Sequence, residues 1–246
     1  MLGPNGHGSQ PGVETLVDRR LRGRYRAGVH RFIPIDRPVE RIARCIAGLA
    51  LFGIGISLLI DANLGAAPWD VFHTGISELT GWPVGTIIIV TGIVILALWI
   101  PLKESPGLGT VLNAFEIGLV VGVVLPIIPE PEALIPRIAM MLGGVVVIAV
   151  GSGLYIGAGL GPGPRDGLMT GLARHGLSIR LARTGIEVIV LIAGVLLGGS
   201  IGIGTAVFAL GIGPLVQVFL PRLTMRDVPT TASTDVCAPS VPETGT

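Results

Sequence analysis

Leu64-Gly65-Ala66-Ala67-Pro68-Trp69-Asp70 is the stretch that decides the fold, because the chain repeats it. Ninety-six residues later the sequence reads Leu160-Gly161-Pro162-Gly163-Pro164-Arg165-Asp166, and 6 of the 13 positions in 64–76 match those in 160–172. A second pair, Gly107-Leu108-Gly109-Thr110 and Gly202-Ile203-Gly204-Thr205, recurs at an offset of 95. Two copies at so long a period indicate an internal duplication, not a solenoid repeat. We therefore expect two related halves, residues 41–128 and 137–222.

The composition places this duplication in a membrane. Half of the residues are apolar and 13% are charged, and the mean hydropathy is +0.77, which excludes an ordinary soluble domain. Several apolar runs are long enough to cross a bilayer as helices. The sequence therefore predicts an all-α fold, a polytopic bundle of membrane helices with the lipid bilayer as its surroundings. The six runs are 42–60, 83–100, 109–128, 138–160, 181–198 and 203–220.

Polar tails flank this apolar region. We expect residues 1–40 and 223–246 to be disordered, because they are poor in apolar residues. The first tail is rich in arginine beside the first span, which is typical of a cytoplasmic anchor that attracts anionic lipid head groups. With six spans and the N-terminus inside, 16 of the 17 basic residues fall on cytoplasmic segments and only Arg137 lies outside. Both termini are therefore expected in the cytoplasm. The basic run has little aromatic interleaving, so we do not expect nucleic acid as a partner.

The number of spans in each half sets the relation between the halves. Three is odd, so the second half is expected to be inverted relative to the first, as in many secondary transporters and channels. This holds only if the two repeated stretches do not cross the membrane. Each carries charges that are costly in a lipid-exposed span, and each begins with a proline suited to a first helical position. We expect short half-helices that fold back into the protein. If they crossed, the protein would have eight spans and parallel halves, and the charge bias would fit almost as well.

The repeated stretches hold the first candidates for a solute or ion pathway. Asp70 and Asp166 each follow a proline by two positions, in the first turn of a helix. There they either complement the helix dipole or face each other and bind a cation or a proton. Arg165 either pairs with Asp166 or with a lipid phosphate, or holds an anionic group at the helix N-terminus. His73 is either a proton shuttle or a satisfied polar residue.

The spans hold further candidates. Glu116 and Asn113 lie three residues apart in the third span, where an ionisable side chain is costly and usually faces an interior. We expect both to line the pathway. Glu187 follows Arg183 by four residues, so the two are expected to pair. We recognise no phosphate-binding loop, zinc-type cluster or catalytic triad. Enzymatic activity, a cofactor and a metal site are therefore not expected.

At these motifs the chain resembles the YczE/YyaS/YitT-like family of bacterial integral membrane proteins. The similar features are Gly-Ile-Ser-Leu at 55–58, the motif at 64–70, Thr-Gly-Trp-Pro-Val-Gly-Thr at 80–86, and the glycine-rich stretch at 159–171. The resemblance covers about 41–222. It implies a bacterial plasma-membrane protein with five or six spans, and it brings no established substrate or reaction.

Two hypotheses of function follow from the duplication and the charges. The first is a small-solute or ion transporter of the plasma membrane, with Asp70, Asp166 and Glu116 along its pathway and Arg165 setting charge preference. The second is a non-transporting membrane scaffold or regulator that acts through its basic N-terminus. A homo-oligomer is compatible with both.

Overall fold

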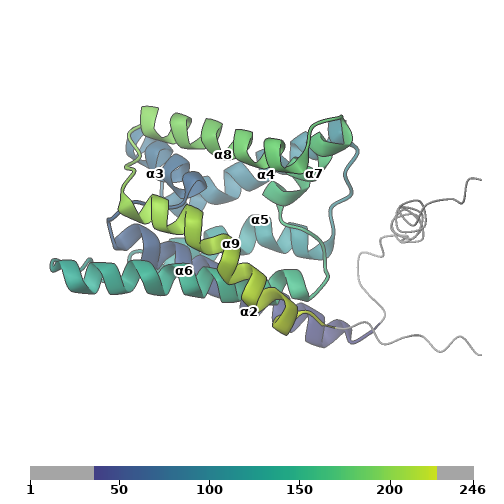
Figure 1. Cartoon of the computed structure of the whole chain (residues 1–246), viewed down its shortest axis with the longest axis horizontal. Coiled ribbons are helices and arrows are strands. Elements are labelled where there is room, and N and C mark those ends of the chain that lie inside the picture. Colours follow the sequence, from purple (N-terminus) through teal and green to yellow (C-terminus); the bar gives the residue numbers. More distant parts are fainter. Residues whose placement is uncertain (1–35, 226–246) are drawn as a thin grey trace, which may run out of the picture.

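The computed structural model describes residues 36–225, and this part of the chain is a bundle of eight helices without strands (Figure 1). The all-helical prediction is confirmed. The expectations for residues 1–35 and 226–246 lie outside the described residues. The helices are α2 (Pro38–Asp61), α3 (Pro68–Thr80), α4 (Val84–Leu102), α5 (Leu108–Val124), α6 (Leu134–Gly157), α7 (Pro164–Arg174), α8 (Ile179–Leu196) and α9 (Ile203–Leu223).

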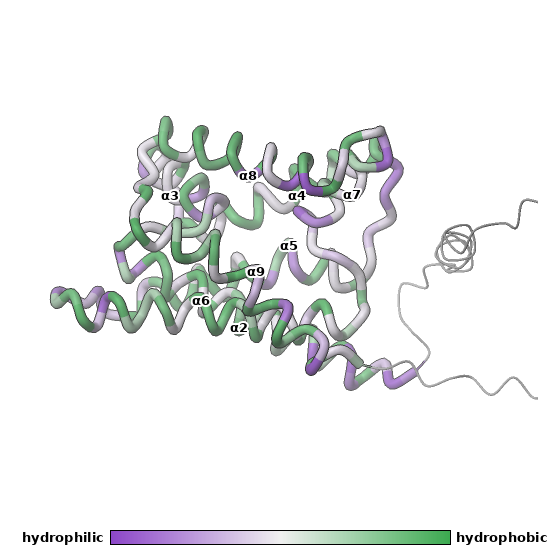
Figure 2. Tube along the Cα trace, in the orientation of Figure 1, coloured by the Kyte–Doolittle hydropathy of each residue, from purple (hydrophilic) through white to green (hydrophobic). Residues whose placement is uncertain are grey.

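Four of these helices, α2, α4, α6 and α9, are long and apolar enough to cross a membrane. Helix α5 is also apolar but has 17 residues. Helix α8 has 18 residues and carries Arg180, Arg183 and Glu187. Hydrophobic residues follow most of the helix lengths, and hydrophilic residues gather toward the two ends of the bundle (Figure 2). This distribution is the one expected of helices in a bilayer.

Helices α2 and α6 pack on each other more extensively than any other pair of the described helices, and they run antiparallel along the lower side of the bundle in Figure 1. A Cβ atom at Gly48 would lie 2.6 Å from the Tyr155 nitrogen and 2.8 Å from the Gly151 oxygen. A Cβ atom at Gly55 would lie 2.9 Å from the Gly144 oxygen. The two backbones are thus in direct contact, which only small residues permit. The main apolar core lies along this helix pair, and its buried residues include Leu49, Ile56, Leu59, Val145 and Ile148.

An arginine closes each end of this helix pair. Arg41, near the start of α2, donates to the carbonyl oxygen of Ala158 beyond the end of α6, at 2.9 Å. Arg137, in the first turn of α6, donates to the carbonyl oxygens of Ala62, at 2.9 Å, and of Asn63, both beyond the end of α2. Helix ends leave carbonyl groups unpaired, and a guanidinium satisfies them with strong, charge-assisted hydrogen bonds.

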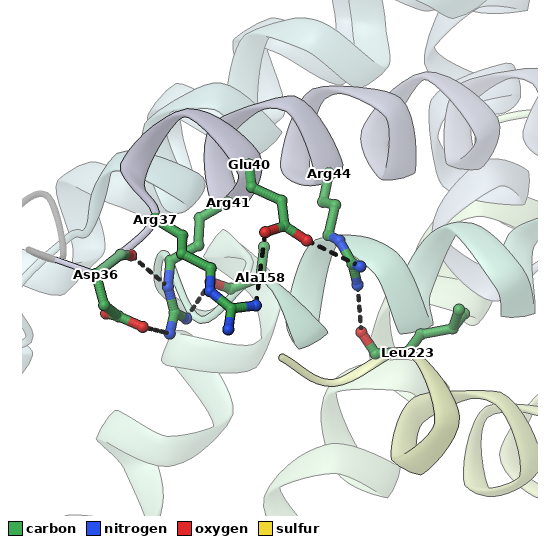
Figure 3. A network of polar contacts seen from close by, with 7 residues as sticks. All are labelled: Asp36, Arg37, Glu40, Arg41, Arg44, Ala158 and Leu223. Carbon is green, nitrogen blue, oxygen red and sulfur yellow. Dashed lines mark hydrogen bonds and ion pairs between the residues drawn. The ribbon is translucent and has the colours of Figure 1, made fainter. Parts of the chain in front are cut away.

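The described arginines of the N-terminal basic run bind groups of the protein itself (Figure 3). Arg41 is 3% exposed and pairs with Asp36 at 2.5 Å. Its guanidinium holds the pKa of the Asp36 carboxyl below the usual range. Arg44 pairs with Glu40 at 3.1 Å and donates to the carbonyl oxygen of Leu223 at 3.4 Å. This end of the run therefore ties α2 to the C-terminal ends of α6 and α9. The arginines before position 36 lie outside the described residues.

The two repeated stretches form the short helices α3 and α7, which begin at Pro68 and Pro164 as predicted. Helix α3 has 13 residues and packs on α8, and α7 has 11 residues and packs on α4. Both are too short to cross a bilayer. Before each helix the chain turns at a glycine with positive φ, +101° at Gly65 and +121° at Gly161. Residues with a side chain rarely adopt this conformation, so these glycines fix the direction from which each short helix enters.

Each turn also docks on the first residues of a distant helix. The Gly109 nitrogen of α5 donates to the Leu160 carbonyl oxygen at 2.9 Å. The Gly204 nitrogen of α9 donates to the Leu64 carbonyl oxygen at 2.7 Å. The second pair of repeated motifs, which contains Gly109 and Gly204, thus holds the first pair in place.

Candidate functional site

A cavity of about 370 Å³ lies where the N-terminal ends of α3 and α7 meet. The Arg165 guanidinium of α7 stands 4.7 Å from the centre of the Trp69 ring of α3, so the first turns of the two helices are adjacent. Each helix N-terminus contributes partial positive charge. The charged residues of the lining are Asp70, Arg165, Asp166, Arg183 and Glu187, and most of the remaining wall is apolar.

The α7 side of the cavity is a cluster of hydrogen-bonding groups. Asp166 accepts a hydrogen bond from the Tyr155 hydroxyl at 3.2 Å. A Cβ atom at Gly163 would lie 3.3 Å from the Tyr155 hydroxyl oxygen and 3.4 Å from both the Asn113 amide nitrogen and an Asp166 oxygen. The side chains of Tyr155, Asn113 and Asp166 therefore surround Gly163, which has no side chain of its own. Asp166 is exposed to the cavity and retains free acceptor capacity there.

The α3 side holds a buried acid and imidazole pair. Asp70 is 2% exposed and His73 is fully enclosed, and their Oδ1 and Nδ1 atoms are 3.7 Å apart. This distance is too long for a hydrogen bond. Among the described residues, neither ring nitrogen of His73 nor the Asp70 Oδ1 atom has a hydrogen-bond partner. Unpaired buried polar atoms are destabilising and uncommon. A proton bound by this pair would give it a charge-assisted hydrogen bond.

Arg165 stacks on the face of Trp69, a cation–π contact. Within the range 36–225 its guanidinium has no hydrogen bond and no ion pair within 4.0 Å. Of the alternatives for this residue, pairing with Asp166 is therefore not seen. Its side chain lines the cavity together with the carboxylates of Asp70 and Asp166, which lie beyond ion-pair distance from it.

The structure brings most of the predicted site residues together. Asp70, Asp166, Arg165 and Asn113 line the cavity, whereas His73 is fully enclosed near Asp70 and is not among the lining residues. Glu116 is not among the lining residues, and its Oε2 atom is buried without a hydrogen-bond partner among the described residues.

The pairing predicted for Glu187 with Arg183 is confirmed, at 3.1 Å. Both of these residues also belong to the cavity wall. They were expected to have a structural role, and their place in the wall was not expected.

Two aromatic residues of the site escape prediction from sequence. Tyr155 lies in an apolar run and has no repeated partner to mark it. Trp99 of α4 is 2% exposed, and its Nε1 atom donates to the Pro164 carbonyl oxygen at 3.0 Å. Its ring lies so close to Gly167 that a Cβ atom there would be 1.8 Å from a ring carbon. Trp99 therefore fixes the position of the N-terminal end of α7.

Comparison with known proteins gives the family. The model of a family of unknown function, DUF6198, matches residues 39–221. An uncharacterized protein of Haemophilus influenzae is 39% identical over 182 residues, which cover 74% of this chain and 84% of that protein. The uncharacterized membrane protein YczE of Bacillus subtilis is 35% identical, over 72% of this chain and 83% of its own length.

The uncharacterized protein YyaS of Bacillus subtilis is 26% identical, over 71% of this chain and 89% of its own length. No solved structure matches the chain. The resemblance to YczE and YyaS is thus confirmed, and the apolar helices agree with the membrane location that the name of YczE states. The chain is a membrane protein that belongs to the YczE- and YyaS-like family DUF6198.

Proposed function

We propose that this protein transports a small solute or ion across the bacterial plasma membrane, with no catalytic step. The observation that carries this proposal is the charged cavity between the N-terminal ends of α3 and α7. Meeting half-helix ends form the solute sites of many secondary transporters, because their free N–H groups and dipoles act inside the bundle. A cavity with charges from both short helices is costly to maintain in a membrane unless a solute or ion uses it.

We further propose that the halves 41–128 and 137–222 are inverted repeats with three spans each. Their contacts are reciprocal: Arg41 binds Ala158 while Arg137, 96 residues later, binds Ala62, which precedes Ala158 by 96. The turn contacts are reciprocal as well, because Gly109 of the first half binds Leu160 of the second and Gly204 of the second half binds Leu64 of the first. Reciprocal contacts of this kind are expected when a two-fold axis relates the two halves. Because α2 and α6 are antiparallel, such an axis lies in the membrane plane, as in inverted-repeat transporters.

In this arrangement six helices cross the membrane, and α3 and α7 enter from opposite faces. Six crossings leave both termini on one face, which the distribution of basic residues makes the cytoplasmic one. Rocking of one half against the other would expose the cavity to each face in turn. The Asp70 and His73 pair lies where proton binding can be linked to the charge state of the cavity. The alternative, a scaffold that acts through its basic N-terminus, depends mostly on residues before position 36, which lie outside the described part of the chain.

The test is a flux experiment that works with an unidentified solute. Purified protein is reconstituted into vesicles loaded with a bacterial metabolite extract, and efflux is followed by mass spectrometry. We expect at least one small polar solute to leave faster than from protein-free vesicles, and this flux to be lost in Asp166→Asn and Arg165→Gln. Glu78→Gln, an exposed residue of α3 outside the cavity, is the matched control and should keep the flux. Equal flux in all variants would contradict the proposal.

A further inference from the structure

Helices α8 and α9 leave an open seam between them, whereas α4 and α5 pack closely. A Cβ atom at Gly85 would lie 2.3 Å from the Gly118 oxygen, and one at Gly92 would lie 3.1 Å from the α5 backbone. Ninety-five residues after Gly85 and Gly92, helix α8 has Arg180 and Glu187. Helix α8 packs on α3 and α7 and does not pack along α9. The small residues that close the first helix pair are thus replaced by large charged residues in the second.

The cavity continues into this seam. Its wall includes Arg183 and Glu187 from α8 and, from α9, Phe208, Ala209, Ile212, Gly213 and Val216. A Cβ atom at Gly213 would meet nothing within 4 Å, so the seam is not filled by the described residues. Helix α9 is one of the helices able to cross a membrane. In a bilayer the seam therefore connects the cavity sideways with the lipid chains.

The chemistry of the wall changes along this path. At the inner end, Arg165 has no acceptor among the described residues, and Asp166 has one hydrogen bond, from Tyr155. Asp70 also lines the cavity, but it lies on the α3 side beside His73. A ligand group with a single charge can pair with only one of the two neighbouring residues Arg165 and Asp166, whereas a group with both charges can pair with each. Along the seam the α9 side is mostly apolar. The path thus fits a polar head at its inner end and an apolar chain along α9.

We propose that the seam between α8 and α9 is a lateral entrance for an amphiphile with a zwitterionic head and an apolar chain. The head binds between Arg165 and Asp166, and the chain lies in the seam against α9 and leads to the membrane. This inference rests on the proposed function and names its substrate class.

Quenching of Trp69 fluorescence tests the entrance. Trp69 lines the cavity, Trp82 is 56% exposed and Trp99 is 2% exposed. Trp82→Phe removes the exposed tryptophan. The fluorescence of Trp69 is then obtained by subtracting the signal of the double variant Trp69→Phe/Trp82→Phe from that of Trp82→Phe. The probe is a single-chain phosphocholine with bromine atoms on its chain, added to vesicles of unbrominated lipid. We expect saturable quenching of Trp69, and at least tenfold weaker apparent affinity for the same chain with a trimethylammonium or a phosphate head.

A matched pair of variants tests the route. Gly213→Phe fills the seam and should reduce quenching at least fivefold, and Ala209→Phe on the same face of α9 should do the same if Gly213→Phe fails to fold. Gly143→Phe is the control, because a Cβ atom at this α6 glycine also meets nothing within 4 Å and Gly143 does not line the cavity. Equal quenching in Gly213→Phe and Gly143→Phe would overturn the inference. Equal affinity for a probe with a singly charged head would also overturn it. So would a disulfide-linked dimer of Gly213→Cys, because a second copy of the chain would then cover the seam.

Two further measurements distinguish a bilayer lipid from a soluble amphiphile, and failure of the entrance from failure of the transport proposal. Quenching by a double-chain brominated phosphocholine lipid would identify a bilayer lipid, and quenching by the single-chain probe alone would identify an amphiphilic solute. Both results support the entrance. If aqueous iodide quenches Trp69 and brominated chains do not, the entrance is wrong and the proposed transport stands. If neither reaches Trp69 and flux is unchanged in Asp166→Asn, both proposals fail.

Discussion

Replacing Gly167 with alanine is expected to push Trp99 away from α7 and to destabilise the protein. The added Cβ atom would lie 1.8 Å from the Trp99 Cζ2 atom and 2.4 Å from Cη2. Carbon atoms in contact are about 3.5–4.0 Å apart, so the enclosed ring has to move by about 2 Å. That movement breaks the hydrogen bond of 3.0 Å from the Trp99 Nε1 atom to the Pro164 carbonyl oxygen.

The expected loss of stability follows from three contributions. Overpacking a filled interior costs about 1–3 kcal/mol, and leaving buried hydrogen-bond partners unpaired costs about 1–3 kcal/mol. The better helix propensity of alanine returns about 1 kcal/mol. The free energy of unfolding should therefore fall by about 1–5 kcal/mol.

Denaturant unfolding of purified protein in detergent, followed by tryptophan emission, measures this change. Gly143→Ala is the control and should be as stable as the wild type or slightly more stable, since its Cβ atom has open space. Trp99→Phe shortens the clashing ring, so Gly167→Ala should cost less in that background than in the wild type. The reasoning is refuted if Gly167→Ala matches Gly143→Ala in stability, or if the effects of Gly167→Ala and Trp99→Phe are additive.

Three other predictions concern the ends of the helices. Arg41→Gln should lower the free energy of unfolding by about 1.5–3 kcal/mol, because the buried carbonyl of Ala158 loses a charged donor. Arg44→Gln should change the free energy of unfolding by less than about 1 kcal/mol. Equal effects of the two variants in urea titrations would contradict the stabilising role of the contact between Arg41 and Ala158. Arg41 lowers the pKa of Asp36, so the stabilisation from this pair is present above the pKa of an unfolded aspartate, about 3.9, and is lost as the pH falls through the lower folded value. Melting temperatures measured from pH 6 downward should show this acid-dependent loss in the wild type and less of it in Asp36→Asn. The Thr110 hydroxyl donates to a carbonyl oxygen of the turn before α7 at 2.7 Å, so Thr110→Val should destabilise by about 1–3 kcal/mol, and Thr110→Ser should restore most of the loss in the same assay.

The local parts of the fold could be predicted because they depend on short-range chemistry. A proline at the first helical position marks the starts of α3 and α7, and apolar runs of spanning length mark the long helices. The first-turn positions of Asp70 and Asp166 follow from the same prolines. These residues line one cavity because two similar local motifs occur on helices whose N-terminal ends meet.

The remaining features depend on contacts between distant segments, which no local pattern specifies. Glu116 and Asn113 lie on one stretch of α5, but the glycine contact of Gly118 with Gly85 fixes the rotation of that helix and leaves Glu116 outside the cavity. Arg41 appears in sequence as one member of a basic run. It is buried because the carbonyl of Ala158, more than a hundred residues later, ends a helix beside it. The stacking of Arg165 on Trp69 likewise needs the two short helices to be adjacent.

Side-specific cysteine labelling tests most directly the claim that the halves are inverted around the cavity. Glu78→Cys and Arg174→Cys, both at exposed positions near the C-terminal ends of α3 and α7, are introduced separately into a background in which Cys45 and Cys237 are replaced by alanine. Intact cells are treated with a membrane-impermeant maleimide, and inverted vesicles give the opposite face. We predict that Glu78→Cys is labelled only from outside and Arg174→Cys only from the cytoplasm. Labelling of both cysteines from the same face would mean parallel halves and would contradict the inverted repeat on which the transport proposal rests.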